Sequence, residues 1–478
     1  MIPRGRLLRI TVIALLACTA AVVLWVPVTK MFAGVQINYN EGWNAARVAM
    51  LEKGEQLYAA PPVYIDTNYP PISFHFTALL ARITGNANLA GRWTAMLSLL
   101  GICAVIGLMV WTFTANAFAS VWAGLTFVIC VAVFAPDRPG MNDPHLLAML
   151  LMSAGLYVFF RSESSVPLLC ASAAMFALSL FTKDNLVAIP AAVGLHLLMS
   201  GPIRRFLVWT GTFCAATGAL FAATIWLDGP FFIAHLTAAR AYSILQGWLR
   251  FTYFVWIFEI AIAAAAIWAI RNWRRPDRQV LVLAFPLTMA FALLFAGGTG
   301  VDFNIFFDCM LVIVLMVSIG LADLMPLLER ARSGSVLLIA ALLLPLLGVF
   351  TLLPTCLQSE RQEVALLADT EDDTAKAVEA IESKSGAALC EDLLFCVEAG
   401  KPYLFDPYFV YNQIKTGRLA EEPVLEMLRS HRFSTVEVAV GPAEPSEHVR
   451  FTAAFMRTLL EYYRPVLTAR NYVILVPM

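Results

Sequence analysis

Residues 36–71 read QINYNEGWNAARVAMLEKGEQLYAAPPVYIDTNYPP and form a polar stretch between two long apolar segments. The stretch holds several acids within a short distance and begins a few residues after the first apolar segment, Leu7–Val28. A polar stretch in this position contacts both water and the surface of a membrane. The sequence therefore predicts a membrane-surface loop here, and the flanking segments decide on which side it lies.

The composition is that of a membrane protein. The 478 residues are 60% hydrophobic and 14% charged, and the mean hydropathy is +0.73. Soluble domains carry roughly 45–50% apolar and about 25% charged residues. The net charge of −1, without a basic block or stripe, gives no sign of a nucleic-acid partner. No CxxC or HExxH spacing occurs, so the sequence has no recognisable zinc or redox motif.

Apolar runs of about 20 residues can cross a bilayer, and the sequence contains about eleven of them. The first, Leu7–Val28, has a long apolar run and a poor cleavage site, which favours a retained anchor over a cleaved signal peptide. The others lie near residues 87–113, 115–135, 144–161, 166–182, 185–200, 206–227, 251–270, 279–297, 304–322 and 335–354. A re-entrant pair is the alternative for 166–182 and 185–200, and Pro70–Arg82 is a short amphipathic segment at the interface.

Arginines decide the orientation, because loops on the cytoplasmic side are enriched in positive charge. With a cytoplasmic N-terminus, the cytoplasmic loops carry Arg161, Arg204, Arg205, Arg271, Arg274, Arg275, Arg278, Arg330 and Arg332. The same count places residues 36–71, 136–143, 228–250 and 297–304, the TKDN turn and the whole C-terminus outside the cytoplasm.

The composition changes after Pro354. Residues 1–354 are predicted to form the membrane domain, and residues 355–478 are long enough for a small extracytoplasmic α/β domain. A helix is expected over residues 361–384 and strands over 435–440 and 472–476. If this region lies outside the cytoplasm, Cys390 and Cys396 are either a disulfide across a short loop or two unrelated buried thiols, and the sequence favours neither.

The stretch 36–71 supplies the first candidate acids. Asn40 is expected to cap an amphipathic helix that starts at Glu41 and lies along the membrane surface. An acid in the first turn is also favoured by the helix dipole, so Glu41 has a purely structural explanation too. Asp66 and Tyr69 end the stretch, where Tyr69 is followed by two prolines that make a rigid re-entry into the membrane.

Further candidates follow in the other outer loops. Asp143 precedes a proline and suits a helix cap, but with Asp137 and Arg138 it also suits an outer cavity shared with Glu41. Lys183 either snorkels to the interface or offers its charge to a lipid phosphate.

Later in the chain, acids stand at or inside apolar segments. Asp302 and Asn304 begin a late span, and Asp308 and Glu259 lie inside spans, where an acid is costly. Arg240 and Arg250 lie in the loop 228–250. The aromatic side chains near them either stack on sugar or form an ordinary interfacial belt.

Several short motifs occur in a fixed order and on one predicted side of the membrane. They are an acid after the first span, YPP, NDPHLLAML, a TK-x-x turn, DFNIFFD and a C-terminal AGKP…DP. This pattern resembles bacterial GT-C fold glycosyltransferases, in particular the glycosyltransferase 39-like proteins related to protein O-mannosyltransferases and the lipid A aminoarabinose transferase. The resemblance covers nearly the whole chain.

The resemblance implies an all-α polytopic protein of the bacterial cytoplasmic (inner) membrane with a periplasmic α/β domain. It implies transfer, with inversion, of a sugar from a polyprenyl-phosphate donor in the membrane lipid to an acceptor hydroxyl on a glycan, lipid or protein. Glu41 matches the family's acid near the acceptor. The partner acid frequent in the family is replaced by Asn40, so either Glu41 does the work alone or Asp143 or Asp66 shares it. No cofactor or metal ligand is assigned, and a divalent cation is compatible with the resemblance.

These considerations give each candidate a role. Glu41 and Asp143 are the predicted catalytic residues, with Glu41 as the general base that takes the acceptor's proton. The predicted substrate contacts are Asp66, Tyr69, Asp137, Arg138, Lys183, Arg240, Arg250, Asp302 and Asn304. Within this set Lys183, Arg138, Arg240 and Arg250 are expected, in that order, to stabilise the phosphate.

Two other functions stay open. A transporter or flippase for a lipid or small solute also has many spans with intramembrane acids, although the sequence lacks the inverted repeats typical of many transporters. A catalytically inactive member of the same fold is conceivable because of Asn40.

Overall fold

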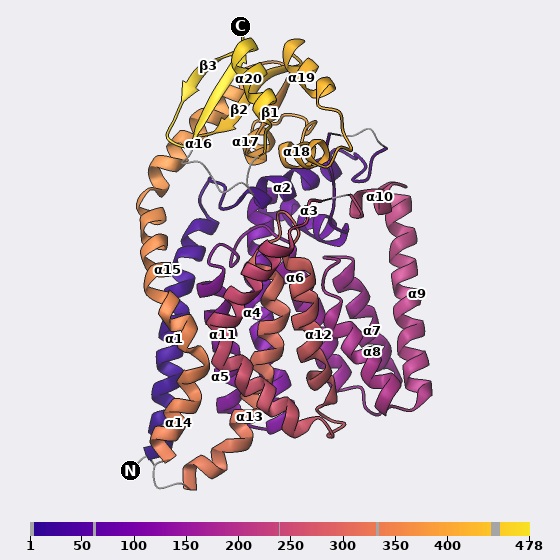
Figure 1. Ribbon diagram of the computed structural model, residues 1–478, viewed down its shortest axis with the longest axis vertical. Helices are drawn as coiled ribbons and strands as arrows, with labels where there is room; N and C mark the ends of the chain where they lie inside the picture. The colour runs from indigo at the N-terminus through magenta and orange to yellow at the C-terminus, as the bar shows by residue number, and fades with distance from the viewer. Residues whose placement is uncertain (1–3, 61–63, 239, 331–333, 441–449) are drawn as a thin grey trace.

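The computed structural model describes residues 4–60, 64–238, 240–330, 334–440 and 450–478. It has two layers (Figure 1). Long helices run side by side in a bundle, and a smaller layer that contains the sheet and the C-terminus covers one end. The first helix begins at Arg4, at the other end of the bundle.

Eight segments of the described chain are long and apolar enough to cross a membrane. The helices that form these segments are α1 (Arg4–Met31), α4 (Ala87–Thr114), α5 (Ala117–Phe134), α9 (Ile203–Leu227), α11 (Ile244–Asn272), α12 (Gln279–Ala296), α13 (Phe307–Arg330), α14 (Gly334–Leu343) and α15 (Leu347–Ala365), with the short 3-10 helices η1 (Phe303–Phe306) and η2 (Leu344–Leu346) joining some of them. All eight coincide with predicted spans.

Shorter apolar helices occupy the other predicted segments: α3 (Ile72–Thr84), α6 (His145–Phe160), α7 (Val166–Leu180) and α8 (Ala188–Ser200). A helix rises about 1.5 Å per residue, so the 13 residues of α8 measure roughly 20 Å, less than a hydrocarbon core of about 30 Å. The count of eleven spans therefore stays a prediction for α6, α7 and α8. The expected amphipathic segment 70–82 is α3.

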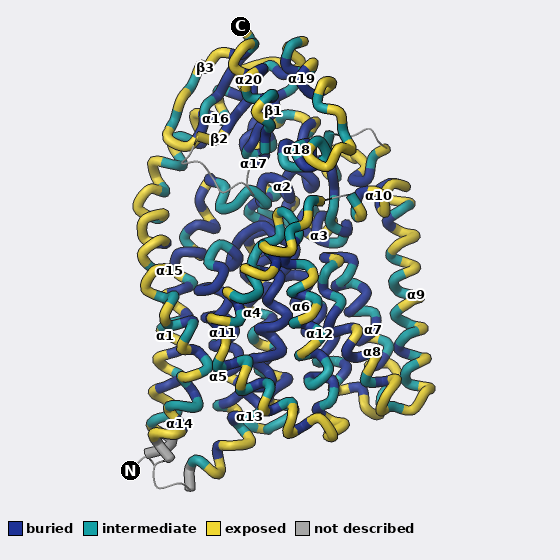
Figure 2. The backbone as a smooth tube through the Cα atoms, in the orientation of Figure 1, coloured by how far each residue is buried: buried dark blue, intermediate teal, exposed yellow. Residues whose placement is uncertain are grey.

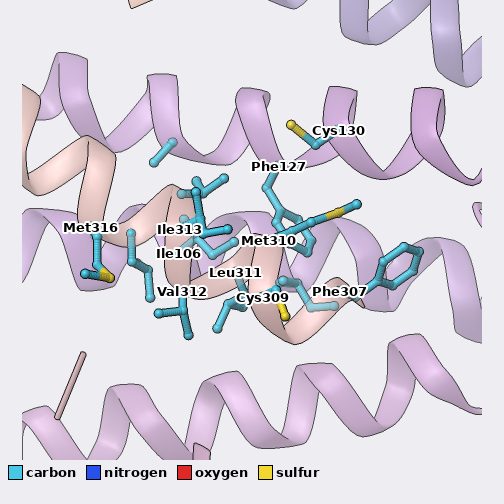
Figure 3. Packing of buried hydrophobic residues seen from close by; sticks show 14 of the residues in the cluster. Ile106, Phe127, Cys130, Phe307, Cys309, Met310, Leu311, Val312, Ile313 and Met316 are labelled. Atoms are coloured by element: carbon cyan, nitrogen blue, oxygen red, sulfur yellow. The ribbon is translucent and has the colours of Figure 1, made fainter. Parts of the chain in front are cut away.

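Helix α13 lies at the centre of the bundle. The most apolar window of the segment Phe303–Leu328 is 94% buried, whereas only 6% of the corresponding window of α9 is buried. Figure 3 shows Phe307, Met310 and Ile313 of α13 packed beside Phe127 of α5 and Ile106 of α4. Helices in a membrane associate through such close packing, because lipid tails are as apolar as the side chains. Figure 2 shows this buried interior, with exposed positions along α9 and α15.

The polar loops predicted to share one side do gather at one end. Five segments lie at the end covered by the C-terminal layer (Figure 1). They are the segment with α2 (Tyr39–Glu52), the α5–α6 loop, the α7–α8 turn, α10 (Phe232–Leu236) and the α12–α13 loop. The loops that carry the clustered arginines, α8–α9 and α11–α12, lie at the opposite end. Which end faces the cytoplasm stays a prediction.

The C-terminal layer is an α/β unit. Its sheet has the order β1-β2-β4-β3, in which β1 (Ala387–Cys390) is parallel to β2 (Phe433–Ala439), and β4 (Tyr472–Pro477) is antiparallel to β2 and β3 (Tyr463–Thr468). The helices are α16 (Leu367–Glu382), α17 (Leu393–Glu398), α18 (Pro407–Lys415), α19 (Glu422–Arg429) and α20 (Ala453–Tyr462).

Several predictions for this layer are confirmed. The two expected strands are β2 and β4, and the expected helix over 361–384 is the end of α15 followed by α16. Of the two alternatives for Cys390 and Cys396, the structure has the disulfide. The division at residue 354 stays a prediction, because α15 continues across it to Ala365.

Candidate functional site

Helix α2 differs from the prediction in two respects. Its cap is Asn38, whose extended backbone lets the side chain accept a hydrogen bond from the Asn40 N–H, so the prediction of Asn40 as the cap was wrong. The second difference is burial, because an amphipathic helix on a membrane surface would expose one face; whether α2 runs parallel to the membrane stays a prediction. Every residue from Glu41 to Val48 is buried, because the bundle covers one face of α2 and the C-terminal layer covers the other.

Glu41 is fully buried and fully hydrogen-bonded. Arg92 of α4 donates from Nε to Oε1 at 2.8 Å and from Nη2 to Oε2 at 2.7 Å. The backbone N–H of Ile37 donates to Oε2 at 2.7 Å and that of Asn142 donates to Oε1 at 2.9 Å. A general base needs a lone pair within reach of the acceptor. The role of Glu41 as the base therefore stays a prediction that requires Arg92 to release one oxygen.

The predicted candidates of two other loops meet around the Arg138 guanidinium. Its Nη1 donates to Asp143 Oδ2 at 3.2 Å, its Nη2 donates to Asp302 Oδ2, and its Nε lies 3.7 Å from Asp137 Oδ1. Asn38 donates to Asp137 Oδ2 at 2.9 Å, which joins the start of α2 to this group. The α5–α6 loop and the α12–α13 loop, far apart in sequence, thus meet at one cation.

Asp143 also holds Lys183. The Lys183 ammonium lies 3.4 Å from Asp143 Oδ1, and the same oxygen accepts the His145 backbone N–H at 2.8 Å. Burial alone would raise the pKa of Asp143, but the charges of Lys183 and Arg138 outweigh burial and lower this pKa to about 2. Lys183 is itself buried and lies 4.6 Å from the centre of the Tyr69 ring, so it points inward instead of snorkelling.

Asp137 and Asp302 are the more open carboxylates of the cluster. Their side chains are 29% and 42% exposed, against 4% for Asp143. Burial raises the pKa of Asp137, the Arg138 charge opposes this rise, and the Asp302 charge adds to it. Burial acts in the same direction on Asp302, but Arg138 lowers the pKa of that carboxyl below its usual value. Among these acids, Asp137 combines access, a raised pKa and few hydrogen bonds.

Arg240 lies near the cluster but outside its ion pairs. It is exposed, and its charge opposes the rise that burial causes in the pKa of Asp184 and of Tyr408. Asp184 is the solvent-accessible neighbour of Lys183 in the α7–α8 turn. Three groups are therefore close enough to interact electrostatically: Arg240 of the α10–α11 loop, Asp184 of the α7–α8 turn and Tyr408 of the C-terminal layer.

Other predicted residues lie elsewhere or are occupied. Asp66 is buried and paired with His235 of α10 at 3.0 Å. Arg250 donates to the Ala296 carbonyl at 2.7 Å and so anchors the α12–α13 loop. Asn304 is buried in η1. Of the two intramembrane acids, Asp308 is buried and Glu259 is exposed on α11.

Carboxylates are the usual ligands of divalent cations, and the cluster around Arg138 has three of them. No group of three His, Cys, Asp or Glu side chains in the described parts of the chain is arranged to hold one. The three carboxylates of the cluster converge on the Arg138 guanidinium, whose positive charge occupies the place that a cation would need. These residues therefore do not fit a metal ion.

Sequence reasoning missed three residues that shape the site. Arg92 binds Glu41, and Asp406 of the C-terminal layer binds α2. Asp184 is the solvent-accessible neighbour of Lys183 and interacts electrostatically with Arg240. A signal existed for Arg92, because an arginine inside an apolar span is costly unless it has a partner. The other two are ordinary loop acids, and only the fold brings them to the site.

No protein-family model and no curated protein matches the sequence. Solved structures do match. ArnT from Cupriavidus metallidurans is 14% identical, with 97% of each chain covered, and gives a TM-score of 0.60 in the apo state and 0.61 when bound to undecaprenyl phosphate. The Archaeoglobus fulgidus oligosaccharyltransferase tethered with an acceptor peptide is 12% identical over 96% of this chain and 72% of that chain, with a TM-score of 0.58. Both are GT-C fold membrane glycosyltransferases. The chain therefore has the GT-C fold, as its pattern of loops and spans predicts.

Proposed function

We propose that the protein is a membrane glycosyltransferase that moves a sugar from a polyprenyl-phosphate donor to an acceptor hydroxyl at the outer face of a bacterial inner membrane. The fold supports this, since one neighbour with the same fold binds undecaprenyl phosphate and another is tethered with an acceptor peptide. The observation that carries the proposal is the cluster of Arg138, Asp143 and Lys183 at the end of the bundle that the C-terminal layer covers.

The positive charges of the cluster stabilise the leaving group. When the acceptor oxygen attacks the anomeric carbon, the bond from that carbon to the phosphate oxygen breaks and negative charge develops on the lipid phosphate. Preorganised cations lower the energy of that state. Asp143 holds both Lys183 and Arg138 in place through contacts of 3.4 and 3.2 Å, and exposed Arg240 adds a third positive charge nearby.

The acceptor's proton needs a carboxylate. Asp137 suits this task better than Glu41, because the Asp137 side chain is partly exposed and accepts fewer hydrogen bonds, and burial raises its pKa. Glu41 is then a clamp that fixes α2 on α4 through Arg92. In an inverting displacement the acceptor oxygen attacks the anomeric carbon on the face opposite the departing phosphate, and Asp137 is the proposed acceptor of its proton.

The test is a turnover assay with purified protein, a panel of undecaprenyl-phosphate sugars and extracted cell-envelope acceptors, in which released undecaprenyl phosphate is measured. Asp137→Asn is expected to lower turnover by about a hundredfold or more. Lys183→Ala is expected to lower it by a similar factor. The exposed residue Lys53 at the end of α2 provides a control, Lys53→Ala, that should keep wild-type turnover.

Three outcomes would contradict the proposal or its details. Wild-type-like turnover in Lys183→Ala would show that Lys183 does not stabilise the phosphate. Wild-type-like turnover in Asp137→Asn would show that Asp137 is not the base. Donor binding without any turnover favours a catalytically inactive member of the fold.

A further inference from the structure

Asp406 of the C-terminal layer ties that layer to α2. It caps α18, where its Oδ1 accepts the Phe409 N–H at 3.0 Å, and it is only 1% exposed. The same carboxylate accepts two donors from α2: the Tyr39 hydroxyl at 3.2 Å and the Trp43 indole N–H at 3.0 Å. Because Tyr39 and Trp43 are four residues apart, they lie on one face of the helix.

A buried charge compensates Asp406. The Arg47 guanidinium, one turn after Trp43, lies 3.6 Å from Asp406 Oδ2 and is completely buried. It is stacked between two rings, 3.8 Å from the centre of Trp43 and 4.4 Å from that of Tyr403. Tyr403 also donates its hydroxyl to Asp406 at 2.9 Å. The junction is therefore a closed polar network between the two layers, with an ion pair at its centre.

A series of contacts leads from this junction to the phosphate-side cation. The Trp43 ring meets the Tyr69 ring edge-on at 5.1 Å, and the Lys183 ammonium lies 4.6 Å from the centre of Tyr69. Lys183 in turn pairs with Asp143. Tyr69 therefore lies between Trp43 and Lys183.

A second connection starts at the other end of the same face. Tyr39 is the first residue of α2, and Asn38, its neighbour and the helix cap, donates to Asp137. The Asp406 carboxylate is therefore connected by contacts both to the start of α2, next to Asp137, and to the turn that faces Lys183.

We infer that Asp406 is a positioning residue of the proposed site, which the C-terminal layer contributes to hold α2, and through it Lys183 and Asp137, in their working places. The inference rests on the proposed function for the identity of the site. The alternative is that Asp406 only caps α18 and serves the fold of its own layer.

Asp406→Asn separates the two explanations, because asparagine caps a helix as well as aspartate does. The variant keeps the α18 cap but loses the charge opposite Arg47 and an acceptor for α2. Hydrogen exchange of the full-length protein in detergent is expected to rise by about tenfold or more in the amides of residues 39–52, with residues 407–415 unchanged. Unchanged exchange in residues 39–52 overturns the inference.

A double-mutant cycle with Trp43→Phe tests the pathway. Phenylalanine keeps the ring against Tyr69 but removes the N–H that Asp406 accepts, so the two changes should not add in their effect on exchange. Tyr403→Phe is the matched control: it removes a hydroxyl donated to the same carboxylate from within the C-terminal layer and should leave α2 exchange unchanged. Additive effects in the cycle overturn the pathway.

Kinetics provide a readout that loss of folded protein cannot imitate. Asp406→Asn should raise the KM for the undecaprenyl-phosphate donor by about threefold or more, because Lys183 is displaced, whereas a smaller folded fraction lowers only the apparent kcat. An unchanged KM overturns the effect on the site. If the wild-type protein turns over no donor, the proposed function fails, and the exchange experiments alone decide whether Asp406 positions α2.

Discussion

At the scale of single residues, the structure separates acids that are bound from acids that are available. Both oxygens of Glu41 receive two hydrogen bonds each, whereas Asp137 keeps an exposed edge. Sequence position alone favours Glu41, since it follows the first span. The number of donors around each carboxylate, which only the fold determines, favours Asp137.

Glu41→Gln should destabilise the protein as well as affect transfer. The change removes one partner of a buried ion pair and leaves Arg92 uncompensated, which typically costs about 3–5 kcal/mol. Glu52 lies on the same helix but is exposed, so Glu52→Gln is the control. Thermal unfolding in detergent should show a large drop for the first variant and none for the second. An unchanged unfolding temperature for Glu41→Gln would show that the clamp does not stabilise the fold.

Because of Asp143, the free energy of unfolding should depend on pH in the acid range. Its folded pKa of about 2 lies below the value near 4 of an unfolded aspartate, so its carboxylate stabilises the fold by about 2 kcal/mol at neutral pH. This contribution is complete above about pH 4 and is lost as the pH falls toward about 2. Asp143→Asn should be less stable at neutral pH and should lose less stability between these two values. Equal losses in variant and wild type would contradict the assignment.

Much of the cluster follows from the sequence, and its partners do not. Asp137, Arg138, Asp143, Lys183 and Asp302 are each recognisable as polar residues at the outer ends of spans, and the fold does bring them together. That all three acids meet one guanidinium depends on the packing of distant loops. Spacing along the chain carries no information about it.

At the scale of elements, α2 shows why a pattern of apolar residues predicted a helix but not its surroundings. The helix forms where expected, yet Trp43 and Arg47 face the C-terminal layer and not lipid or water. A surface helix and a helix between two layers have the same periodicity. Only the position of residues 387–440 above the bundle distinguishes them (Figure 1).

At Gly42, α2 lies close against the C-terminal layer. A Cβ atom there would lie 2.3 Å from the backbone nitrogen of Leu394 in α17. Gly42→Ala should therefore push the layer away and raise hydrogen exchange in α17. The control is Gly218→Ala in α9, where nothing lies within 4 Å of the added atom, and where alanine should favour the helix by about 1 kcal/mol. Unaltered exchange in α17 for Gly42→Ala would mean that the layers are not closely docked.

At the scale of the whole molecule, the polar loops of the bundle and the C-terminal layer meet at one end. The sequence predicted this grouping through the alternation of spans and loops and through the placement of arginines. It could not predict that the C-terminal layer reaches into the site, because the contacts of Asp406 with α2 join residues more than 360 positions apart.

The orientation of the molecule is tested by labelling in intact cells. Lys384→Cys, on the C-terminal layer, should react with a membrane-impermeant thiol reagent, because that layer is expected outside the cytoplasm. Ser164→Cys, in the exposed α6–α7 loop at the opposite end, should be protected until the membrane is opened. The reverse pattern would place the cluster in the cytoplasm and remove the outer-face proposal.

The most direct test of the central claim is an experimental structure of the protein with undecaprenyl phosphate. The account predicts the lipid phosphate at the covered end of the bundle, within about 3 Å of the Lys183 ammonium or the Arg138 guanidinium. A phosphate group bound at the opposite end, or at the covered end without contact to either cation, would contradict it.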